Sequence, residues 1–312
     1  MAAVVLQRLQ RTPCARRWKR GGRVNLHERK TRKLSAGETR KSVGQVIAAD
    51  RPKAGARPSG LNRSVTRALD LLVDIAHSRS PVSFVDLQKN HRVPKATLHK
   101  LLFTLEALRF VRRDEETGKY SLGLAAMEVS AAGAAGPGDL AMMLRPVLRK
   151  LVEESHETCH FGILNGGEEV LLSRIDPEQQ VVRLALQIGR RHPAYASAGG
   201  LASMALRLDE AVFNALPEEL PQLTENTIKS RTELLDRIDQ IRTQGYALDM
   251  EEAYMGVRCV GVAVAAPNWP VVHVSLSVPL QRAPIERLQE LAKPLMAAAT
   301  EIERILTVTP RR

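Results

Sequence analysis

The chain has 312 residues, of which 44% are hydrophobic and 4% aromatic, and its formal net charge is +12. This length indicates two domains whose cores are built mainly from Leu, Val, Ile and Ala. No apolar run approaches the roughly 18 residues that a membrane span needs, and Cys14, Cys159 and Cys259 show no CxxC spacing. The composition therefore excludes a membrane-spanning protein, a disulfide framework and a cysteine zinc site, and it predicts a soluble protein of the cytoplasm.

The positive charge is concentrated near the N-terminus. Residues 1–60 hold 16 Lys and Arg against 3 acids, residues 61–125 hold 11 against 7, and residues 126–312 hold 19 against 24. A basic segment joined to an acidic one is typical of a nucleic-acid module attached to a domain with another task. Residues 1–60 are predicted to form a basic, disordered arm. The arm could bind DNA phosphates, serve as an organellar transit peptide, or be upstream sequence translated from a wrong start codon.

Three helical segments follow the arm. Apolar residues at helical spacing predict a helix over residues 64–77, and Ser83 suits the N-cap of a short helix that ends near residue 90. After a tight connection, residues 93–110 carry a stripe of leucines at spacings of three and four, with Pro94 in the first turn. The stripe consists of Leu98, Leu101, Leu102, Leu105 and Leu108. Two helices joined by so short a turn form a helix-turn-helix pattern.

The face of residues 93–110 opposite the leucines begins with short or cationic side chains. These are Lys95, Ala96, Thr97, His99 and Lys100. Such a face suits the major groove of DNA, although a solvated amphipathic helix would show the same pattern. Extended pieces at 110–112 and 119–122 then predict a hairpin with Arg112, Arg113 and Lys119 on it. Together these elements predict a DNA-binding winged helix-turn-helix, with a winged helix used for protein contacts as the alternative.

The rest of the chain predicts a second domain. A helix at 124–129 leads to a glycine-rich break at 133–138, and Asp139 is a suitable cap for a helix at 140–155. The elements predicted beyond it are strands at 158–164, 169–175 and 181–186, helices at 198–208, 211–216 and 233–244, strands at 246–248, 258–266 and 271–278, and a helix at 285–305. This order predicts an α+β domain with an antiparallel sheet flanked by helices.

Seven motifs in this order resemble the isocitrate lyase regulator (IclR) type of bacterial transcription factors over residues 61–306. They are SVTRALDLL (64–72), VPKATLHKLLFTLE (93–106), RRDEETGKYSLG (112–123), ETCHFGIL (157–164), IGRRHPAYASAGGLA (188–202), QGYALDMEEAYMGVRCVGVAVAAP (244–267) and SLSVP (275–279). The resemblance implies a winged helix-turn-helix that binds double-stranded promoter DNA as a dimer or tetramer. It also implies a GAF-like domain that binds a small organic effector, often a carboxylic acid or an aromatic catabolite.

The domain boundaries predicted in this way are 1–60 for the arm, 61–123 for the winged helix-turn-helix, 124–138 for an inter-domain helix and linker, and 139–308 for the effector-binding domain. The DNA-binding positions that the resemblance implies are Lys95, Ala96, Thr97, His99 and Lys100, with Arg67, Arg112 and Arg113 at phosphates. The family usually has Ser near Ala96 and Arg at Lys100. Because Lys acts only as a point charge, the operator sequence does not follow from the resemblance.

The effector-binding positions that the resemblance implies are Val181, Leu184, Ala198, Gly199, Asp249, Cys259, Ser275 and Ser277. Backbone N–H groups of a helix that begins near Ala198 would suit a carboxylate. Ser275 and Ser277 would point to one face of their strand. Three alternatives stay open: a turn cap for Asp249, a small buried hydrophobe for Cys259, and a solvent face for the two serines.

Two other hypotheses compete with an effector-gated regulator. One is a cysteine-dependent enzyme with an accessory winged helix, in which Cys259 or Cys159 is the nucleophile and His160 or His273 the base. Adjacent Cys159 and His160 would point to opposite faces of a strand, which argues against that pair. The other makes the arm a general nucleic-acid binder. We expect the regulator, without catalytic residue, cofactor or metal site. Leu201, where the family usually has Lys or Arg, favours a less acidic ligand.

Overall fold

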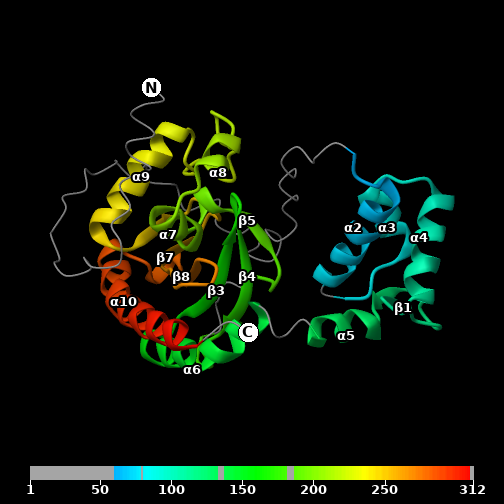
Figure 1. Ribbon diagram of the computed structural model, residues 1–312, viewed down its shortest axis with the longest axis horizontal. Helices are drawn as coiled ribbons and strands as arrows, with labels where there is room; N and C mark the ends of the chain where they lie inside the picture. Colours follow the sequence, from blue (N-terminus) through cyan, green and yellow to red (C-terminus); the bar gives the residue numbers. More distant parts are fainter. Residues whose placement is uncertain (1–59, 79, 133–136, 181–185, 310–312) are drawn as a thin grey trace, which may run out of the picture. The chain divides into compact units, whose positions relative to one another are not determined.

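The computed structural model describes residues 60–78, 80–132, 137–180 and 186–309 (Figure 1). The predicted arm, except for its last residue, lies outside these ranges, as do residues 133–136 of the glycine-rich break and most of the predicted strand at 181–186. None of the described helices is long and apolar enough to cross a membrane. The described elements form a three-helix unit with a hairpin and a larger unit of sheet and helices.

The three-helix unit is the predicted winged helix-turn-helix. Its elements are α2 (Arg63–His77), α3 (Phe84–His91), α4 (Lys95–Ala107), β1 (Val111–Arg113) and β2 (Tyr120–Leu122). The Asn62 side chain caps α2, and Ser83 caps α3 as predicted by accepting a hydrogen bond from the Asp86 N–H. The apolar faces of these elements meet in one core, made of Leu71, Ile75, Leu87, Val93, Leu98, Leu102, Leu105, Val111 and Tyr120.

Helix α4 is shorter than predicted at both ends. Pro94 is its N-cap rather than part of the first turn, and Arg92, at φ 48°, closes α3 in the left-handed conformation. Leu108, predicted to be buried, is 59% exposed. The reason is that α4 ends at Ala107, so Leu108 leaves the helical stripe that buries Leu98, Leu102 and Leu105. The prediction for Leu108 was wrong.

The hairpin is present, shifted by about one residue from its predicted position. Strands β1 and β2 pair in antiparallel register, with Val111 opposite Leu122 and Arg113 opposite Tyr120. The Asp114 carboxylate accepts hydrogen bonds from the Thr117 N–H at 2.8 Å and hydroxyl at 2.6 Å, which closes the loop between the strands. These contacts hold the pKa of Asp114 below its ordinary value.

The chain continues through α5 (Leu124–Ala132) and α6 (Pro137–Ser155) into the larger unit. Its further elements are β3 (Thr158–Asn165), β4 (Glu168–Ile175), β5 (Arg191–Pro193), η2 (Ala194–Ala196), α7 (Ala198–Leu206), α8 (Glu210–Ala215), α9 (Arg231–Gln244), β6 (Ala247–Met250), β7 (Val257–Val264), β8 (Val272–Pro279), η3 (Leu280–Arg282) and α10 (Ile285–Val308). Since α6 begins at Pro137, Asp139 lies inside the helix and is not its cap, contrary to prediction. Strand β5 was not predicted.

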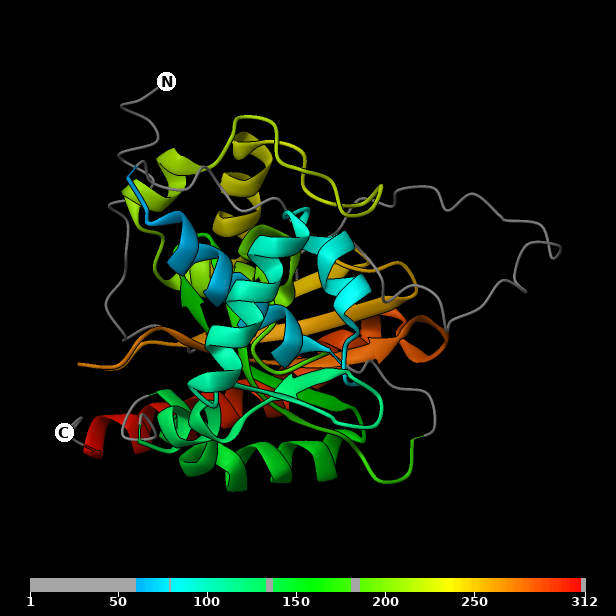
Figure 2. The same ribbon diagram turned by 90° about the vertical axis from the view of Figure 1, so that its right-hand side faces the viewer.

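The strands form one sheet in the order β5-β4-β3-β8-β7-β6, and every neighbouring pair is antiparallel. Helices α6 and α10 lie together on one face of the sheet, whereas α7 and α9 lie on the other (Figures 1 and 2). Alternate side chains of β7 and β8, including Val260, Val262, Val274 and Leu276, enter the core beneath α6 and α10. The α+β fold class with an antiparallel sheet is therefore confirmed.

Candidate functional site

The predicted DNA-reading residues lie along one side of α4. Lys95, Ala96, His99 and Lys100 are exposed, and Thr97 is half-buried. Leu98 and Leu102 on the opposite side are buried in the core, so they fix which way the cations face. The first turn of α4 contains no acid. The N-terminus is the positive end of the helix dipole, and in α4 it also carries cationic side chains. Because no acid in the first turn offsets this positive charge, the N-terminal part of α4 is suited to an anionic partner.

His99 is held in place by a contact that the sequence pattern did not predict. Its imidazole stacks on the Phe84 ring of α3, with 4.3 Å between the ring centroids and 29° between the planes. The stack restricts the rotamers of an otherwise exposed side chain. Residues 15 positions apart in sequence give no periodic signal for such a contact, which depends on how α3 and α4 pack.

The predicted phosphate contacts lie on the hairpin and on α2. Arg112 and Arg113 are exposed on β1, and Arg67 is half-buried on α2. The Arg112 Nε donates a hydrogen bond to the Ser121 Oγ at 3.0 Å, and the Arg113 guanidinium lies 6.0 Å from the centre of the Tyr120 ring. These contacts orient both guanidinium groups and leave further N–H donors of each free to meet phosphate oxygens.

In the larger unit, the sheet face that meets α7 is lined by polar side chains. The register places Asp249, Cys259 and Ser277 side by side on β6, β7 and β8, and Ser275 opposite His160 of β3. Ser275 is 7% and Ser277 2% exposed, so the alternative that these serines form a solvent face is wrong. Both serines point to one face, as predicted, and that face is buried beneath α7.

Hydrogen bonds connect this row of side chains. Cys259 stands opposite Asp249 in the sheet, and its Sγ lies 3.2 Å from the Ser277 Oγ, which in turn lies 3.1 Å from the His160 Nδ1. Burial raises the pKa of Cys259 well above its ordinary value, and Asp249 raises it further. Cys259 is therefore a buried, hydrogen-bonded thiol rather than a plain hydrophobe, and it is separated from the His160 ring by Ser277.

Ser277 should contribute measurably to stability through these two contacts. Ser277→Ala leaves the His160 Nδ1 and the Cys259 Sγ without this partner, so we expect the free energy of unfolding to fall by about 1–2 kcal/mol. Urea denaturation of the full chain measures the change. The control is Ser275→Ala, on the same strand face but outside this chain of contacts, and a loss as large as that of Ser277→Ala would contradict the assignment.

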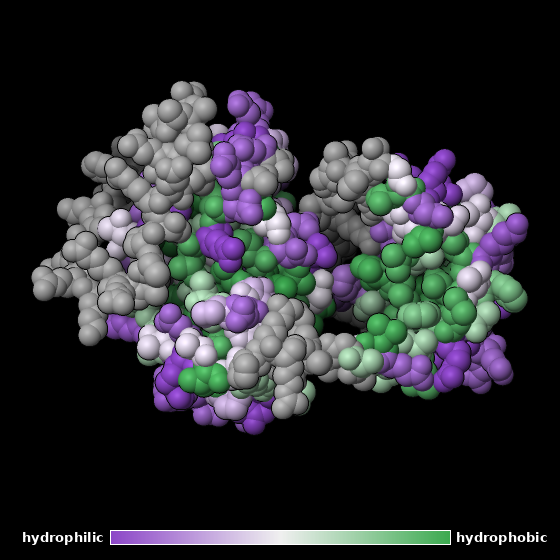
Figure 3. Space-filling view, viewed as in Figure 1, coloured by the Kyte–Doolittle hydropathy of each residue, from purple (hydrophilic) through white to green (hydrophobic). Residues whose placement is uncertain are grey.

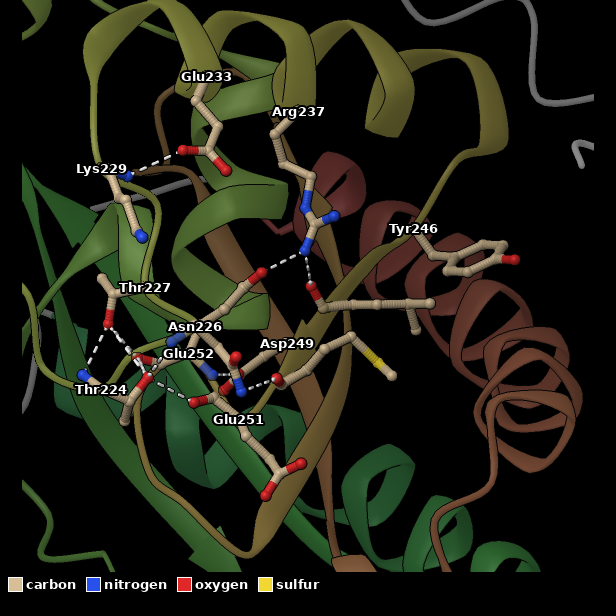
Figure 4. Close-up of polar contacts among 12 residues, drawn as sticks. Thr224, Asn226, Thr227, Lys229, Glu233, Arg237, Tyr246, Asp249, Glu251 and Glu252 are labelled. Atoms are coloured by element: carbon tan, nitrogen blue, oxygen red, sulfur yellow. Dashed lines mark hydrogen bonds and ion pairs between the residues drawn. The ribbon is translucent and has the colours of Figure 1, made fainter. Parts of the chain in front are cut away.

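Asp249 also caps a turn, as the alternative for it predicted. Its Oδ1 accepts a hydrogen bond from the Glu252 N–H at 2.6 Å. Figure 4 shows how the following residues are tied down: the Thr224 and Thr227 hydroxyls donate to the carbonyls of Glu251 and Glu252, each at 2.7 Å. Burial raises the pKa of Asp249. Its carboxyl group is thus fixed at the edge of the polar face.

The N-terminus of α7 approaches this face so closely that only glycine fits. A Cβ on Gly199 would lie 2.1 Å from the His273 Nδ1, and a Cβ on Gly261 would lie 2.7 Å from the Ala198 carbonyl carbon. Ser197 caps the helix by accepting a hydrogen bond from the Gly200 N–H at 3.0 Å. Ala198 and Gly199, both predicted from the resemblance, therefore lie directly against β7 and β8.

Six of the eight predicted effector positions thus gather between α7 and the sheet, namely Ala198, Gly199, Asp249, Cys259, Ser275 and Ser277. Val181 and Leu184 lie outside the described residues. Two residues on this face were not predicted as ligand contacts, His160 and Glu169. The sequence could have predicted His160, because side chains two residues apart in a strand point to the same face. His160 therefore shares the face of Thr158 and Gly162 on β3. Glu169 gave no such signal, because Glu168 beside it is equally polar.

Comparison with known proteins agrees with this arrangement. The model of the IclR helix-turn-helix domain matches residues 64–115, and that of the C-terminal domain of IclR bacterial transcriptional regulators matches residues 133–304. The acetate operon repressor of Salmonella typhimurium is 33% identical over 257 residues, which are 81% of this chain and 93% of that protein. The transcriptional repressor IclR of Escherichia coli is 31% identical over 253 residues, covering 80% and 92%.

Solved structures show the same fold. A transcriptional regulator of this type from Silicibacter superposes with a TM-score of 0.65 and 25% identity, covering 79% of this chain and 98% of that one. An IclR homologue from Microbacterium hydrocarbonoxydans, solved in complex with 4-hydroxybenzoate, superposes with a TM-score of 0.66 and 20% identity, covering 78% and 98%. Motifs, fold and relatives agree across both domains, and the chain belongs to the IclR family of bacterial transcriptional regulators.

Proposed function

We propose that this regulator binds double-stranded operator DNA by inserting the exposed side of α4 into the major groove. One observation carries the proposal. Lys95, His99 and Lys100 lie on the exposed side of α4, and the opposite side of this helix is buried in the core of the winged helix-turn-helix. Arg112 and Arg113 on the hairpin are positioned to contact phosphates, together with Arg67. The proposed domains are 61–123 for DNA binding, 124–138 as the connection and 139–308 for effector binding.

We further propose that a small organic effector binds between α7 and the polar face of the sheet. This face is buried and brings together side chains from five strands. Two of its imidazoles, those of His160 and His273, have nitrogen atoms without a hydrogen-bond partner among the described residues. Such a set of convergent polar groups beneath a helix is a suitable ligand site. An effector that binds one arrangement of the domains better than another would shift operator affinity.

The winged helix-turn-helix also offers a surface for self-association. Hydrophobic residues gather on its visible face in Figure 3. On α2, Val65, Leu69 and Val73 are spaced four residues apart and are 55%, 55% and 45% exposed. An exposed apolar row on a helix whose Leu71 and Ile75 already fill the core suits a second copy of the chain related by a two-fold axis. A dimer, with tetramers as a further step, would present two α4 helices to a palindromic operator.

This row gives a direct prediction. Leu69→Glu places a charge at the centre of the apolar row, so we expect self-association to weaken at least about 10-fold. Sedimentation equilibrium over a range of protein concentrations measures the dissociation constant. Val85→Glu is the matched control, because Val85 is 70% exposed on α3 and lies outside the row. An unchanged association constant for Leu69→Glu would exclude α2 as the interface.

We propose no catalysis for this chain. A cysteine nucleophile needs a thiolate within hydrogen-bond reach of a base. Cys259 meets Ser277 and Asp249 instead of an imidazole, and Cys159 lies in the core beneath α6 and α10, where burial raises its pKa. We also propose a cytoplasmic location, because a DNA-binding regulator acts where the bacterial chromosome lies.

Footprinting tests the proposed function. With DNase I on the DNA upstream of its own gene, we expect a protected segment with two-fold symmetric sequence, as a dimer with two α4 helices requires. A chain that begins at Pro58 should protect the same segment, because residues 61–123 carry the predicted readout. Loss of protection on removal of the arm would favour the reading in which the arm is the DNA binder. No protected segment with the full chain would exclude operator binding at this site.

A further inference from the structure

Phe103 is a large apolar residue on the exposed side of α4, and it does not belong to the predicted DNA-reading set. It is 72% exposed, whereas Leu102 before it is 2% exposed. Successive residues of a helix point about 100° apart, so the phenyl ring is turned away from the core. Among the described residues, the apolar clusters and ring pairs do not include Phe103. Single exposed hydrophobic residues are common, so its position on α4 is more informative than its exposure.

The position of Phe103 continues the side of α4 that carries the predicted DNA-reading residues. Ala96, Lys100 and Phe103 are spaced by four and three residues, so they lie above one another on one side of the helix. All three are exposed. Leu98 and Leu102 on the other side are buried in the core. Phe103 therefore faces the same partner as Lys100.

The spacing along α4 lets Phe103 reach a base pair that the first turn does not reach. Phe103 comes seven positions after Ala96. This separation corresponds to about 10 Å along the helix axis, or about three base-pair steps of DNA. The acid of α4, Glu106, follows and is exposed, and a carboxylate there would repel phosphates. The part of α4 that suits the major groove thus extends from Lys95 to Phe103.

The surroundings of Phe103 favour DNA over a protein partner. Lys100 lies one turn before it and Lys95 lies at the start of the helix, whereas the centres of protein interfaces are depleted of lysine. In the major groove, the group that an apolar side chain contacts specifically is the 5-methyl group of thymine. A phenyl ring that covers this group removes two apolar surfaces from water, so the contact is favourable without a hydrogen bond.

We propose that Phe103 reads a thymine in each operator half-site by covering its 5-methyl group. The inference rests on the proposed insertion of α4 into the major groove, and it adds a specificity-determining residue to the polar and cationic set. A base pair without this methyl group leaves the phenyl ring against water or against the polar edge of a base, so affinity falls.

Removing single methyl groups from the operator tests the inference. Each thymine of the protected duplex is replaced in turn by deoxyuridine, which lacks only the 5-methyl group, and fluorescence anisotropy measures the affinity of the full chain. For the wild type, we expect at least one position in each half-site where the replacement weakens binding by about 4-fold or more, the factor for one buried methyl group. For Phe103→Ala, the same replacement should change the affinity by less than about 2-fold.

Met142→Ala is the matched control variant. Met142 is also a large apolar residue, 75% exposed, and it lies on α6 in the larger unit. This variant should keep the full methyl effect of the wild type. Phe103→Leu keeps an apolar side chain, so its methyl effect should lie between those of the wild type and Phe103→Ala. Because Phe103 is exposed and alanine is the better helix former, the Tm of Phe103→Ala should not fall.

Three results would overturn the inference. One is the absence of any thymine whose methyl group matters to the wild type, and another is an equal methyl effect in the wild type and Phe103→Ala at every sensitive position. The third is an equal loss of affinity of Phe103→Ala for the operator and for a shuffled duplex. All three are measured on a duplex that the wild type protects, so operator binding, which footprinting decides separately, can hold while the inference fails.

Discussion

Replacing Lys95 and Lys100 together by alanine is expected to lower operator affinity by about 100-fold, because each lysine contributes roughly 1–3 kcal/mol through a phosphate or guanine contact. Fold stability should not fall with it. Lys95 is the first residue of α4, and a cation at the positive end of a helix is unfavourable by a few tenths of a kcal/mol or more. Its removal should therefore leave the free energy of unfolding unchanged or slightly higher.

Fluorescence anisotropy with the protected duplex measures this affinity. Lys150→Ala is the matched control, because it removes one exposed lysine from α6 in the larger unit; its side chain is 69% exposed. We expect Lys150→Ala to bind the operator nearly as the wild type does. Equal losses for Lys150→Ala and for the α4 variant would mean that net charge, rather than the face of α4, governs binding.

Gly200→Ala is expected to destabilise the effector-binding domain by about 3 kcal/mol, although alanine is the better helix former by up to about 1 kcal/mol. A Cβ at Gly200 would lie 2.3 Å from the Ala194 carbonyl oxygen and 2.5 Å from the Ala194 Cα. Both are backbone atoms of η2, so no side-chain rotation relieves the overlap. The steric cost should outweigh the helix propensity, and α7 would have to move away from its place above the sheet.

Gly167→Ala is the control for this substitution. A Cβ at Gly167 would meet the Leu216 Cδ2 at 3.5 Å, which is an ordinary van der Waals contact. We expect the free energy of unfolding in urea to change by less than about 0.5 kcal/mol. A similarly small change for Gly200→Ala would show that α7 can shift at low cost, and the close approach of helix and sheet would not then define the site.

Local chemistry explains why so much of the fold could be predicted. The start of α3 depends on a hydrogen bond between Ser83 and a residue three positions later. The end of α9 depends on Gly245, which adopts φ 91° and donates its N–H to a carbonyl four positions earlier. The hairpin of β3 and β4 follows from two alternating segments joined by a short turn that contains glycine. These signals are short-range, and they are visible in the sequence without knowledge of the partner elements.

The features that could not be predicted depend on packing between distant segments. Strand β5 has only three residues and exists because it pairs with β4, as in the Glu169 and His192 register. The stack of His99 on Phe84 requires the angle between α3 and α4. The Glu169 Oε2 lies 3.7 Å from the His273 Nε2 only because the sheet brings β4 and β8 close together. Sequence spacing places none of these pairs together.

The specificity ratio for DNA tests the central claim most directly. Anisotropy titrations at one fixed, moderate salt concentration compare a duplex of the protected upstream segment with a shuffled duplex of equal length and composition. The wild type should prefer the operator by at least about 1,000-fold, and the variant lacking Lys95 and Lys100 should lose most of this preference. Equal affinity of the wild type for the two duplexes would contradict sequence-specific binding through α4.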